Sequence, residues 1–154
     1  TIPLIDSEDF PTKVNHLILG EAWLLGKDAS HGYRIKNLHQ DVFSLNSEII
    51  ENQRKNSQPT GPIGKNYQDQ VLEFEDIGII RRIILALGSQ DVDFSGITPQ
   101  EKGIDYIGST PDISVFDISE YNRDLEIGDK ISFSLNYSAL NRIFSSEYVN
   151  KVLV

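Results

Sequence analysis

The sequence predicts a mainly β domain, built as an antiparallel β-barrel or sandwich, and three observations support this prediction. Residues 74–93 form the most apolar and β-branched stretch of the chain and lack a helical stripe, as expected of a buried strand. Short alternating or apolar runs, with turn residues between them, recur along the rest of the 154 residues. Few residues show the periodicity of a helix. The sequence therefore predicts some seven or eight strands with little helix.

Each expected element follows from its local pattern. Residues 1–15 are irregular because two prolines interrupt them, and the apolar run of residues 17–26 is strand-like with Gly20 inside it. Residues 52–70 collect Asn, Gln, Ser, Pro and Gly without periodicity, which predicts a long mobile loop. The remaining expected elements are strands at residues 42–51, before Gly88, and at 104–108, 113–118, 125–135 and 148–154, a turn-rich connection at 94–103, and one or two turns of helix at 137–144.

The central strand breaks at Gly88 into a polar turn that carries Ser89, Gln90, Asp91 and Asp93. A core strand that ends in exposed amide and carboxylate groups is a common way for a rigid scaffold to present a site. A turn that simply stays in contact with water explains the same pattern, and the pattern alone favours that interpretation. The turn becomes a candidate site only when a resemblance to a known family is added to it.

Composition narrows the class of protein. An apolar fraction of 39% fits a soluble globular chain of one domain, and no segment approaches the ~18 consecutive apolar residues of a membrane span. A net charge of −9 argues against nucleic acid or an anionic membrane as a partner. The absence of cysteine excludes disulfides, zinc–thiolate sites and thiol catalysis. No secretion signal is visible, and we expect a cytoplasmic protein.

Motifs for chemistry are weak when each is judged alone. The three histidines, His16, His31 and His39, have no metal-ligand spacing, so we expect no metal site. No nucleophile elbow is present, residues 61–65 lack the spacing of a phosphate-binding loop, and residues 90–93 lack the glycine and distal glutamate of a calcium loop. These features indicate a soluble β-rich domain and no particular activity.

Five motifs nevertheless occur in one order along the chain. They are Leu-Gly-Glu-Ala-x-Leu-Leu-Gly at residues 19–26, His-Gln-Asp-x-Phe at 39–43, Phe-Glu-Asp-x-Gly-Ile-x-Arg-Arg at 74–82, Gln-Asp-Val-Asp at 90–93 and Leu-Asn-Tyr-x-Ala-Leu at 135–140. In this combination the chain resembles the predicted amino-acid racemases of the alanine/ornithine racemase type, which use pyridoxal phosphate. The match runs from about Pro3 to Val154, and several linked motifs are far more specific than any one of them.

The resemblance implies the C-terminal part of a larger enzyme of the alanine racemase fold. A (β/α)₈ barrel that carries the Schiff-base lysine would precede this chain. Residues 1–26 would be the end of that barrel, with its last strand near residues 17–22, and residues 27–154 would be the C-terminal β-domain. The piece alone would be inactive, since the lysine lies outside it. The chain begins at Thr1 and contains no methionine, which agrees with a processed or truncated piece.

Site residues follow from the resemblance position by position. Gly20 and Glu21 fall where backbone N–H groups meet the cofactor phosphate, an approach that suits a residue without Cβ, and Tyr137 falls where a tyrosine hydroxyl bonds that phosphate. The family forms homodimers in which the β-domain of one subunit covers the barrel mouth of the other. The resemblance therefore implies two loops near a small amino-acid substrate of the partner subunit, with Ser89, Gln90 and Asp91 as catalytic candidates and Pro111 and Asp112 as substrate-binding candidates.

Two positions depart from the family pattern. Ile18 stands where the family usually has an arginine that faces the pyridine nitrogen, and an isoleucine cannot hydrogen-bond that nitrogen. Ser89 stands where alanine racemases place a tyrosine acid/base, although racemisation needs proton transfer on both faces of Cα. Asp91 is one candidate substitute for that tyrosine.

Two alternatives to a racemase domain stay open. The β-domain could be a non-catalytic binding or assembly module that has lost the chemistry, as the residues at positions 18 and 89 suggest. The chain could also be an unrelated β-barrel adaptor whose motif matches are coincidence.

Overall fold

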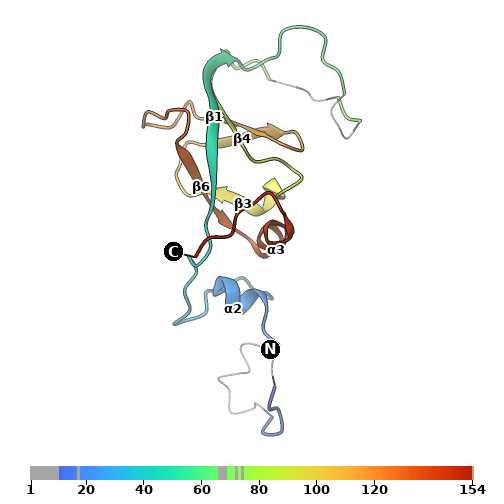
Figure 1. Ribbon diagram of the computed structural model, residues 1–154, viewed down its shortest axis with the longest axis vertical. Helices are drawn as coiled ribbons and strands as arrows, with labels where there is room; N and C mark the ends of the chain where they lie inside the picture. The colour runs from blue at the N-terminus through green and yellow to red at the C-terminus, as the bar shows by residue number, and fades with distance from the viewer. Residues whose placement is uncertain (1–10, 17, 66–68, 72, 74, 154) are drawn as a thin grey trace. The chain divides into compact units, whose positions relative to one another are not determined.

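The computed structural model describes residues 11–16, 18–65, 69–71, 73 and 75–153. The chain divides into two compact units, residues 1–44 and residues 45–154 (Figure 1). Residues 27–44 group with the first unit, while the division at residue 26 between a barrel remnant and a β-domain stays a prediction.

The first unit contains the short helix α2 (Glu21–Leu25), which replaces the strand expected over residues 17–26; residue 17 lies outside the described part. The expectation of a strand is wrong because Glu, Ala and Leu favour helix and none of the five helical residues is β-branched. Gly26 ends the helix in the left-handed conformation, with φ at 62°. A Cβ at Gly26 would lie 2.4 Å from the carbonyl oxygen of His39, so only glycine fits there.

The second unit is a six-stranded antiparallel sheet, which confirms the predicted mainly β fold class. Its strand order is β3-β6-β1-β2-β5-β4. The strands are β1 (Leu45–Asn56), β2 (Ile79–Leu85), β3 (Ile97–Pro99), β4 (Asp105–Ser109), β5 (Ser114–Asp117) and β6 (Lys130–Leu135).

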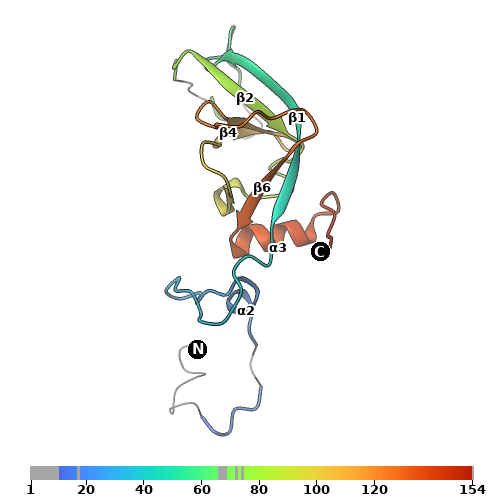
Figure 2. The same cartoon turned by 90° about the vertical axis from the view of Figure 1, so that its left-hand side faces the viewer.

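Strand β1 belongs to both halves of this sheet. Its first residues, from Leu45 to Glu48, pair with β6, and the residues from Ile49 onward pair with β2. The register shifts by one residue between Ile49 and Glu51, and such a bulge bends and twists a strand. Figure 1 shows β1 as the long strand of the unit, and Figure 2 shows β2 alongside its distal half. The bend turns the sheet into a half-barrel with one concave, apolar face.

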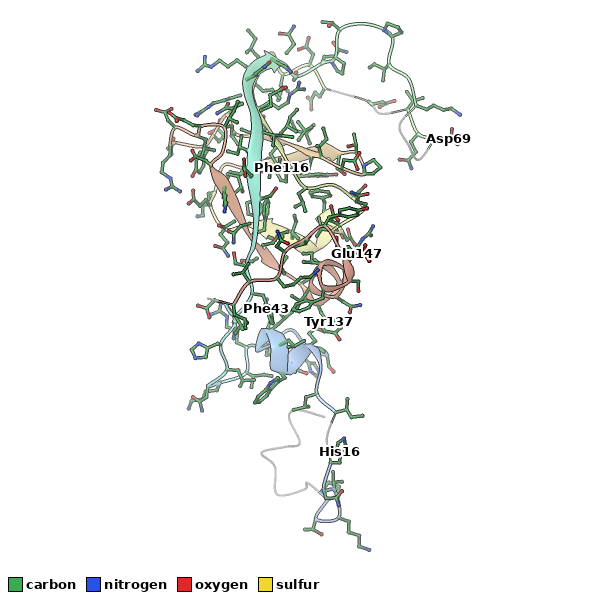
Figure 3. All side chains as sticks on the ribbon, viewed as in Figure 1. His16, Phe43, Asp69, Phe116, Tyr137 and Glu147 are labelled. Atoms are coloured by element: carbon green, nitrogen blue, oxygen red, sulfur yellow. The ribbon has the colours of Figure 1, made fainter. Side chains whose placement is uncertain are left out.

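The core fills this face. Ile83 and Leu85 of β2 are fully buried, as predicted for the central strand, together with Phe116 of β5 and Phe133 of β6. The rings of Phe116 and Phe133 pack with centroids 5.6 Å apart, and Figure 3 labels Phe116 among the strands. Burial of each such side chain contributes roughly 1.5–3 kcal/mol to folding. The core therefore fixes the ends of the strands from which the loops of the site emerge.

Helix α3 (Tyr137–Ser145) forms where the helical spacing predicted it. The side chain of Asn136 caps it, since its Oδ1 accepts a hydrogen bond from the N–H of Ala139 at 2.9 Å. Ala139 and Ile143 bury the apolar face of the helix, which lies beside β6 and the 3₁₀ helix η1 (Phe94–Gly96) (Figures 1 and 2). Neither helix among the described residues has the length and apolar character needed to cross a bilayer.

Three further expectations differ from the structure. The described strands number six rather than seven or eight, because the strands expected over residues 17–26 and 148–154 do not form in the described part of the chain, while β3 is an additional one. Residues 148–153 are irregular, and their β-branched side chains find no neighbouring strand to pair with. Strand β3 lies in the expected turn-rich connection; it is short and at the sheet edge, where Pro99 is tolerated. Strand β1 extends through Asn56, into the segment expected to be a mobile loop.

Candidate functional site

Two loops at one end of the sheet are joined through their backbones. One is the turn that follows β2, and the other links β4 to β5. The N–H of Ser89 donates to the carbonyl oxygen of Thr110 at 2.9 Å, and the N–H of Gln90 donates to that of Pro111 at 3.1 Å. The hydroxyl of Ser89 also donates to Thr110 O at 3.2 Å. The structure thus brings together Ser89, Gln90 and Pro111, three of the predicted site residues.

Gly88 makes this contact between the loops possible. A Cβ at this position would lie 1.8 Å from the carbonyl oxygen of Pro111 and 2.4 Å from the nitrogen of Asp112. The turn then closes on itself, since the N–H groups of Asp91 and Val92 both donate to Gly88 O. Strand order explains the meeting of the loops, because β2 and β4 both pair with β5.

The joined loops form one wall of an open cleft of about 530 Å³. The turn after β2, the η1 segment, β4, the β4–β5 loop and α3 all contribute to it. Its lining residues are Ser89, Gln90, Val92, Asp93, Phe94, Tyr106, Ser109, Pro111 and Arg142. A cleft with a few polar groups on an aromatic base is the usual form of a small-molecule site.

Aromatic side chains make the base of the cleft rigid. The rings of Phe94 and Tyr106 stack with centroids 4.7 Å apart and an interplanar angle of 16°. Phe116 meets the Tyr106 ring edge-on at 5.6 Å, which ties the stack to the core. The Tyr106 hydroxyl and the Ser109 hydroxyl lie 2.8 Å apart in a hydrogen bond. The ring of Tyr106 is therefore held from below and at its tip.

Asp93 carries the negative charge of the cleft. Its Oδ1 accepts hydrogen bonds from the N–H of Ser95 at 3.0 Å and from the hydroxyl of Ser95 at 2.8 Å, and these cap η1. The bonds from Ser95 hold the pKa of Asp93 below its usual range, and the positive charge of Arg142 lowers that pKa further. The carboxylate is accordingly ionised at neutral pH.

Arg142 carries the positive charge of the cleft and reaches it from α3. Its Nη2 donates a hydrogen bond to the carbonyl oxygen of Ser89, 53 residues away in the sequence. This bond fastens the turn after β2 to the helix. Helix α3 therefore supports the loop and also contributes a guanidinium to the cleft.

Asp91 and Asp112 do not line the cleft. Asp91 is only 6% exposed, and its Oδ1 accepts a hydrogen bond from the hydroxyl of Ser146 at 2.6 Å. The N–H of Ser146 donates in turn to the carbonyl oxygens at the end of α3, so Asp91 ties the turn to that helix end. Asp112 is exposed beside the cleft, where its N–H donates to the Thr110 hydroxyl at 3.4 Å.

The three residues predicted to bind a cofactor phosphate lie at helix starts. Gly20 precedes α2, whose first helical residue is Glu21, and no side chain caps this helix. Tyr137 begins α3, and its side chain is partly exposed (Figure 3). Gly20 and Glu21 belong to the first unit and Tyr137 to the second.

Sequence reasoning missed part of the cleft. It placed Asp93 in the polar turn after Gly88 without naming it as a site residue, and it did not single out Phe94, Tyr106, Ser109 or Arg142. A tyrosine on a predicted strand, whose hydroxyl needs a polar partner, was a signal for Tyr106. Arg142 carried no signal, because an arginine on an exposed helix face is ordinary and only the tertiary structure brings it to Ser89.

A separate cluster, formed by Glu101, Tyr121 and Arg123, pairs its polar groups with one another. The hydroxyl of Tyr121 and the guanidinium of Arg123 both donate to the carboxylate of Glu101, and the Arg123 guanidinium lies 5.5 Å from the Tyr121 ring centroid. The bonds from Arg123 and then from Tyr121 hold the pKa of Glu101 below its usual range. This cluster clamps the connection after β3 to the connection after β5, and its geometry indicates a structural role.

Histidines form no metal site in the described part of the chain. His31 Nδ1 lies 2.7 Å from Asp28 Oδ2, and the His31 ring stacks on Tyr33 with centroids 5.7 Å apart. Among the described residues, no group of three or more His, Asp or Glu side chains could hold an ion.

Two known proteins are similar to this chain along nearly all of its length. Ornithine racemase of Acetoanaerobium sticklandii is 37% identical over 154 residues, which cover 100% of this chain and 44% of that protein. Lysine racemase of Thermotoga maritima is 34% identical over 148 residues, which cover 96% of this chain and 42% of that protein. No family model matches the chain, and no solved structure matches it.

Both relatives are amino-acid racemases, which are isomerases, and this agrees with the resemblance seen in the sequence. The chain spans less than half the length of either relative.

Proposed function

We propose that this chain is the C-terminal β-domain of a pyridoxal-phosphate-dependent racemase whose substrates are basic amino acids of the ornithine or lysine type. The similarity to two racemases with these substrates supports the proposal. In the full-length protein an N-terminal barrel would carry the lysine that binds the cofactor. The chain by itself would not racemise any amino acid.

One observation in the structure carries this proposal furthest. The two loops that the family resemblance assigns to the substrate, at Ser89–Gln90 and at Pro111, are joined by backbone hydrogen bonds along one wall of a single cleft. These loops follow separate strands, β2 and β4, and come together because both strands pair with β5. We further propose that the barrel of the partner subunit in a homodimer covers the open side of this cleft.

The donors that this chain offers suit the phosphate of pyridoxal phosphate. The residues that the resemblance assigns to this phosphate carry neutral donors, which are the backbone N–H groups at Gly20 and Glu21 in the first unit and the phenolic O–H of Tyr137 in the second. Neutral N–H and O–H donors of this kind bind a phosphate group. Ile18 is 91% exposed and offers no donor, so the pyridine nitrogen would receive no hydrogen bond from that side chain. Pyridoxal phosphate, when bound, would supply the electron sink that stabilises negative charge at Cα.

The main role of the residues of the cleft wall would be to position the substrate, and not every one of them would exchange protons with it. The Ser89 hydroxyl donates to Thr110 O, and a serine is too weak an acid and base to act unaided at Cα. Gln90 presents an exposed amide that can hydrogen-bond a carboxylate or an amine. Asp91 would support the loop from behind, because its carboxylate is bound to Ser146.

Activity of the full-length protein tests the proposal. The coding region upstream of Thr1 is expressed with this chain, and the purified protein is supplied with pyridoxal phosphate. We expect cofactor absorbance and conversion of L-ornithine and L-lysine to their D-enantiomers. Chiral chromatography measures this conversion. Exchange of the Cα hydrogen for deuterium in D₂O should accompany this conversion.

The chain of residues 1–154 is the control, and it should show no conversion under the same conditions. A full-length protein that binds no cofactor and racemises no amino acid would contradict the proposed function.

A second candidate function is a non-catalytic binding or assembly module. Ile18 and Ser89, which stand in place of the two functional side chains of the family, favour it. Under this alternative the full-length protein would keep the fold and the dimer but would neither bind the cofactor nor exchange the Cα hydrogen. Replacing Ile18→Arg would then restore neither property.

A further inference from the structure

We infer that Asp93 selects substrates by binding the distal ammonium group of a basic amino acid, with the face of Tyr106 alongside the aliphatic chain. This inference rests on the proposed function. It adds the residue responsible for the substrate class, which neither the motifs nor the similarities assign.

Charge is the first argument. Among the described residues that line the cleft, Asp93 carries the only carboxylate and Arg142 the only guanidinium. The guanidinium already donates to Ser89 O on the loop side. A basic amino acid presents an ammonium at the end of its side chain, and a carboxylate is the partner that binds it with a charge-assisted hydrogen bond.

The geometry of Asp93 is the second argument. Both hydrogen bonds from Ser95 go to Oδ1, and Oδ2 accepts none from the described residues. The side chain is half-buried and fixed by the η1 turn, so little conformational entropy is lost when a ligand binds the second oxygen. A fixed carboxylate with one oxygen available is suited to accept from an ammonium.

The aromatic base of the cleft is the third argument. The Phe94–Tyr106 stack presents an apolar face that can cover three or four methylene groups, and an aromatic face attracts a cation placed over it. A side chain that is apolar along its length and cationic at its tip matches a surface with aromatic rings and one carboxylate. An aliphatic side chain without the ammonium would leave Asp93 without a ligand partner.

Asp93 also caps η1, and this structural role must be separated from substrate selection. The variant Asp93→Asn separates the two roles, because its amide oxygen can still accept both hydrogen bonds from Ser95 while the negative charge is lost. Asp105→Asn is the matched control. Asp105 is an exposed carboxylate on β4 that does not line the cleft.

The experiment measures kcat/KM of the full-length protein for lysine and for norleucine, which has the same chain length without the ammonium. The same pair of ligands is titrated calorimetrically, so that binding is observed apart from turnover. We expect Asp93→Asn to lower kcat/KM and affinity for lysine by about 10- to 100-fold, as for a lost hydrogen bond to a charged group. The kcat/KM and the affinity for norleucine should stay within about twofold of the wild-type values. Asp105→Asn should leave both quantities unchanged for either substrate.

The results distinguish this inference from the proposed function. If the wild-type protein racemises lysine and Asp93→Asn keeps its preference for lysine over norleucine, the inference is wrong and the proposed function stands. If Asp93→Asn lowers kcat/KM and affinity equally for lysine and norleucine, Asp93 only supports the fold of the cleft, and the inference is again wrong. If the wild-type protein racemises neither, the proposed function itself has failed.

Discussion

Gly88 and Pro111 pack so closely that no side chain can stand between them. A Cβ on residue 88 would come within 1.8 Å of the Pro111 carbonyl oxygen. This contact joins the turn after β2 to the loop after β4, and both loops line the cleft. The contact therefore serves the fold and the proposed site together.

Gly88→Ala should push these loops apart. We expect the free energy of unfolding to fall by about 1–3 kcal/mol, the usual cost of forcing an extra methyl group into a packed position. Gly108→Ala is the control, since nothing lies within 4 Å of a Cβ there and its φ is not positive. Urea denaturation followed by circular dichroism measures both. Equal stability of the two variants would contradict the close contact.

The bond between Asp91 and Ser146 should stabilise the end of α3. Ser146→Ala leaves a carboxylate that is 6% exposed without its hydrogen-bond donor, and we expect a loss of about 1–3 kcal/mol. Ser145→Ala removes an exposed hydroxyl that donates to a helix carbonyl, and it should cost within about 0.5 kcal/mol. If the two variants melt at the same temperature, Asp91 does not hold the loop.

Two isoleucines of β2 provide a matched test of the core. Ile83 is fully buried, whereas Ile79 is 71% exposed on the same strand. Ile83→Ala should lower the free energy of unfolding by about 2–5 kcal/mol, because it removes packed methyl groups and leaves a cavity. Ile79→Ala should change it by about 0.5 kcal/mol or less. A reversed order would contradict the burial of Ile83 and the exposure of Ile79.

Acid should weaken the clamp formed by Glu101 with Arg123 and Tyr121. The bonds from Arg123 and then Tyr121 hold the pKa of Glu101 below its ordinary value of 4.5. The folded pKa is therefore lower than the unfolded one, and the stabilisation is complete above 4.5 and disappears as the pH falls through the folded value. Denaturation midpoints of the wild-type protein and Glu101→Gln should differ at neutral pH and converge in acid.

A nuclear magnetic resonance titration checks the same interaction directly. The pKa of Glu101 should rise toward its ordinary value in Arg123→Gln, since the largest cause of its depression is removed. A pKa of Glu101 that is the same in both proteins would show that the ion pair does not form in solution.

The sequence by itself determined the elements whose residues carry a strong local preference. The β-branched run at Ile79–Leu85 forms the central strand, and the Asn136 cap with apolar residues at helical spacing forms α3. The turn at Gly88 follows from its residue type. These features depend on neighbours in the chain, which any sequence window contains.

Where the local preference is weak or misleading, the tertiary structure decided whether a strand forms. Strand β3 exists because β6 offers it a partner, and residues 148–153 stay irregular because no strand lies beside them, although their residue types favour one. Propensity for β structure is a preference for a pleated surface that must already be there.

The candidate site divides in the same way. The family resemblance marked Ser89, Gln90 and Pro111, and the structure joined them. Only the fold could bring Asp93, Tyr106 and Arg142 to that cleft, because the Arg142–Ser89 bond spans 53 residues and the Phe94–Tyr106 stack depends on how β4 meets η1. A sequence states which chemical groups a chain carries and its local conformational preferences; which of those groups share a cleft depends on long-range packing of strands and helices, and that packing is a property of the folded chain as a whole.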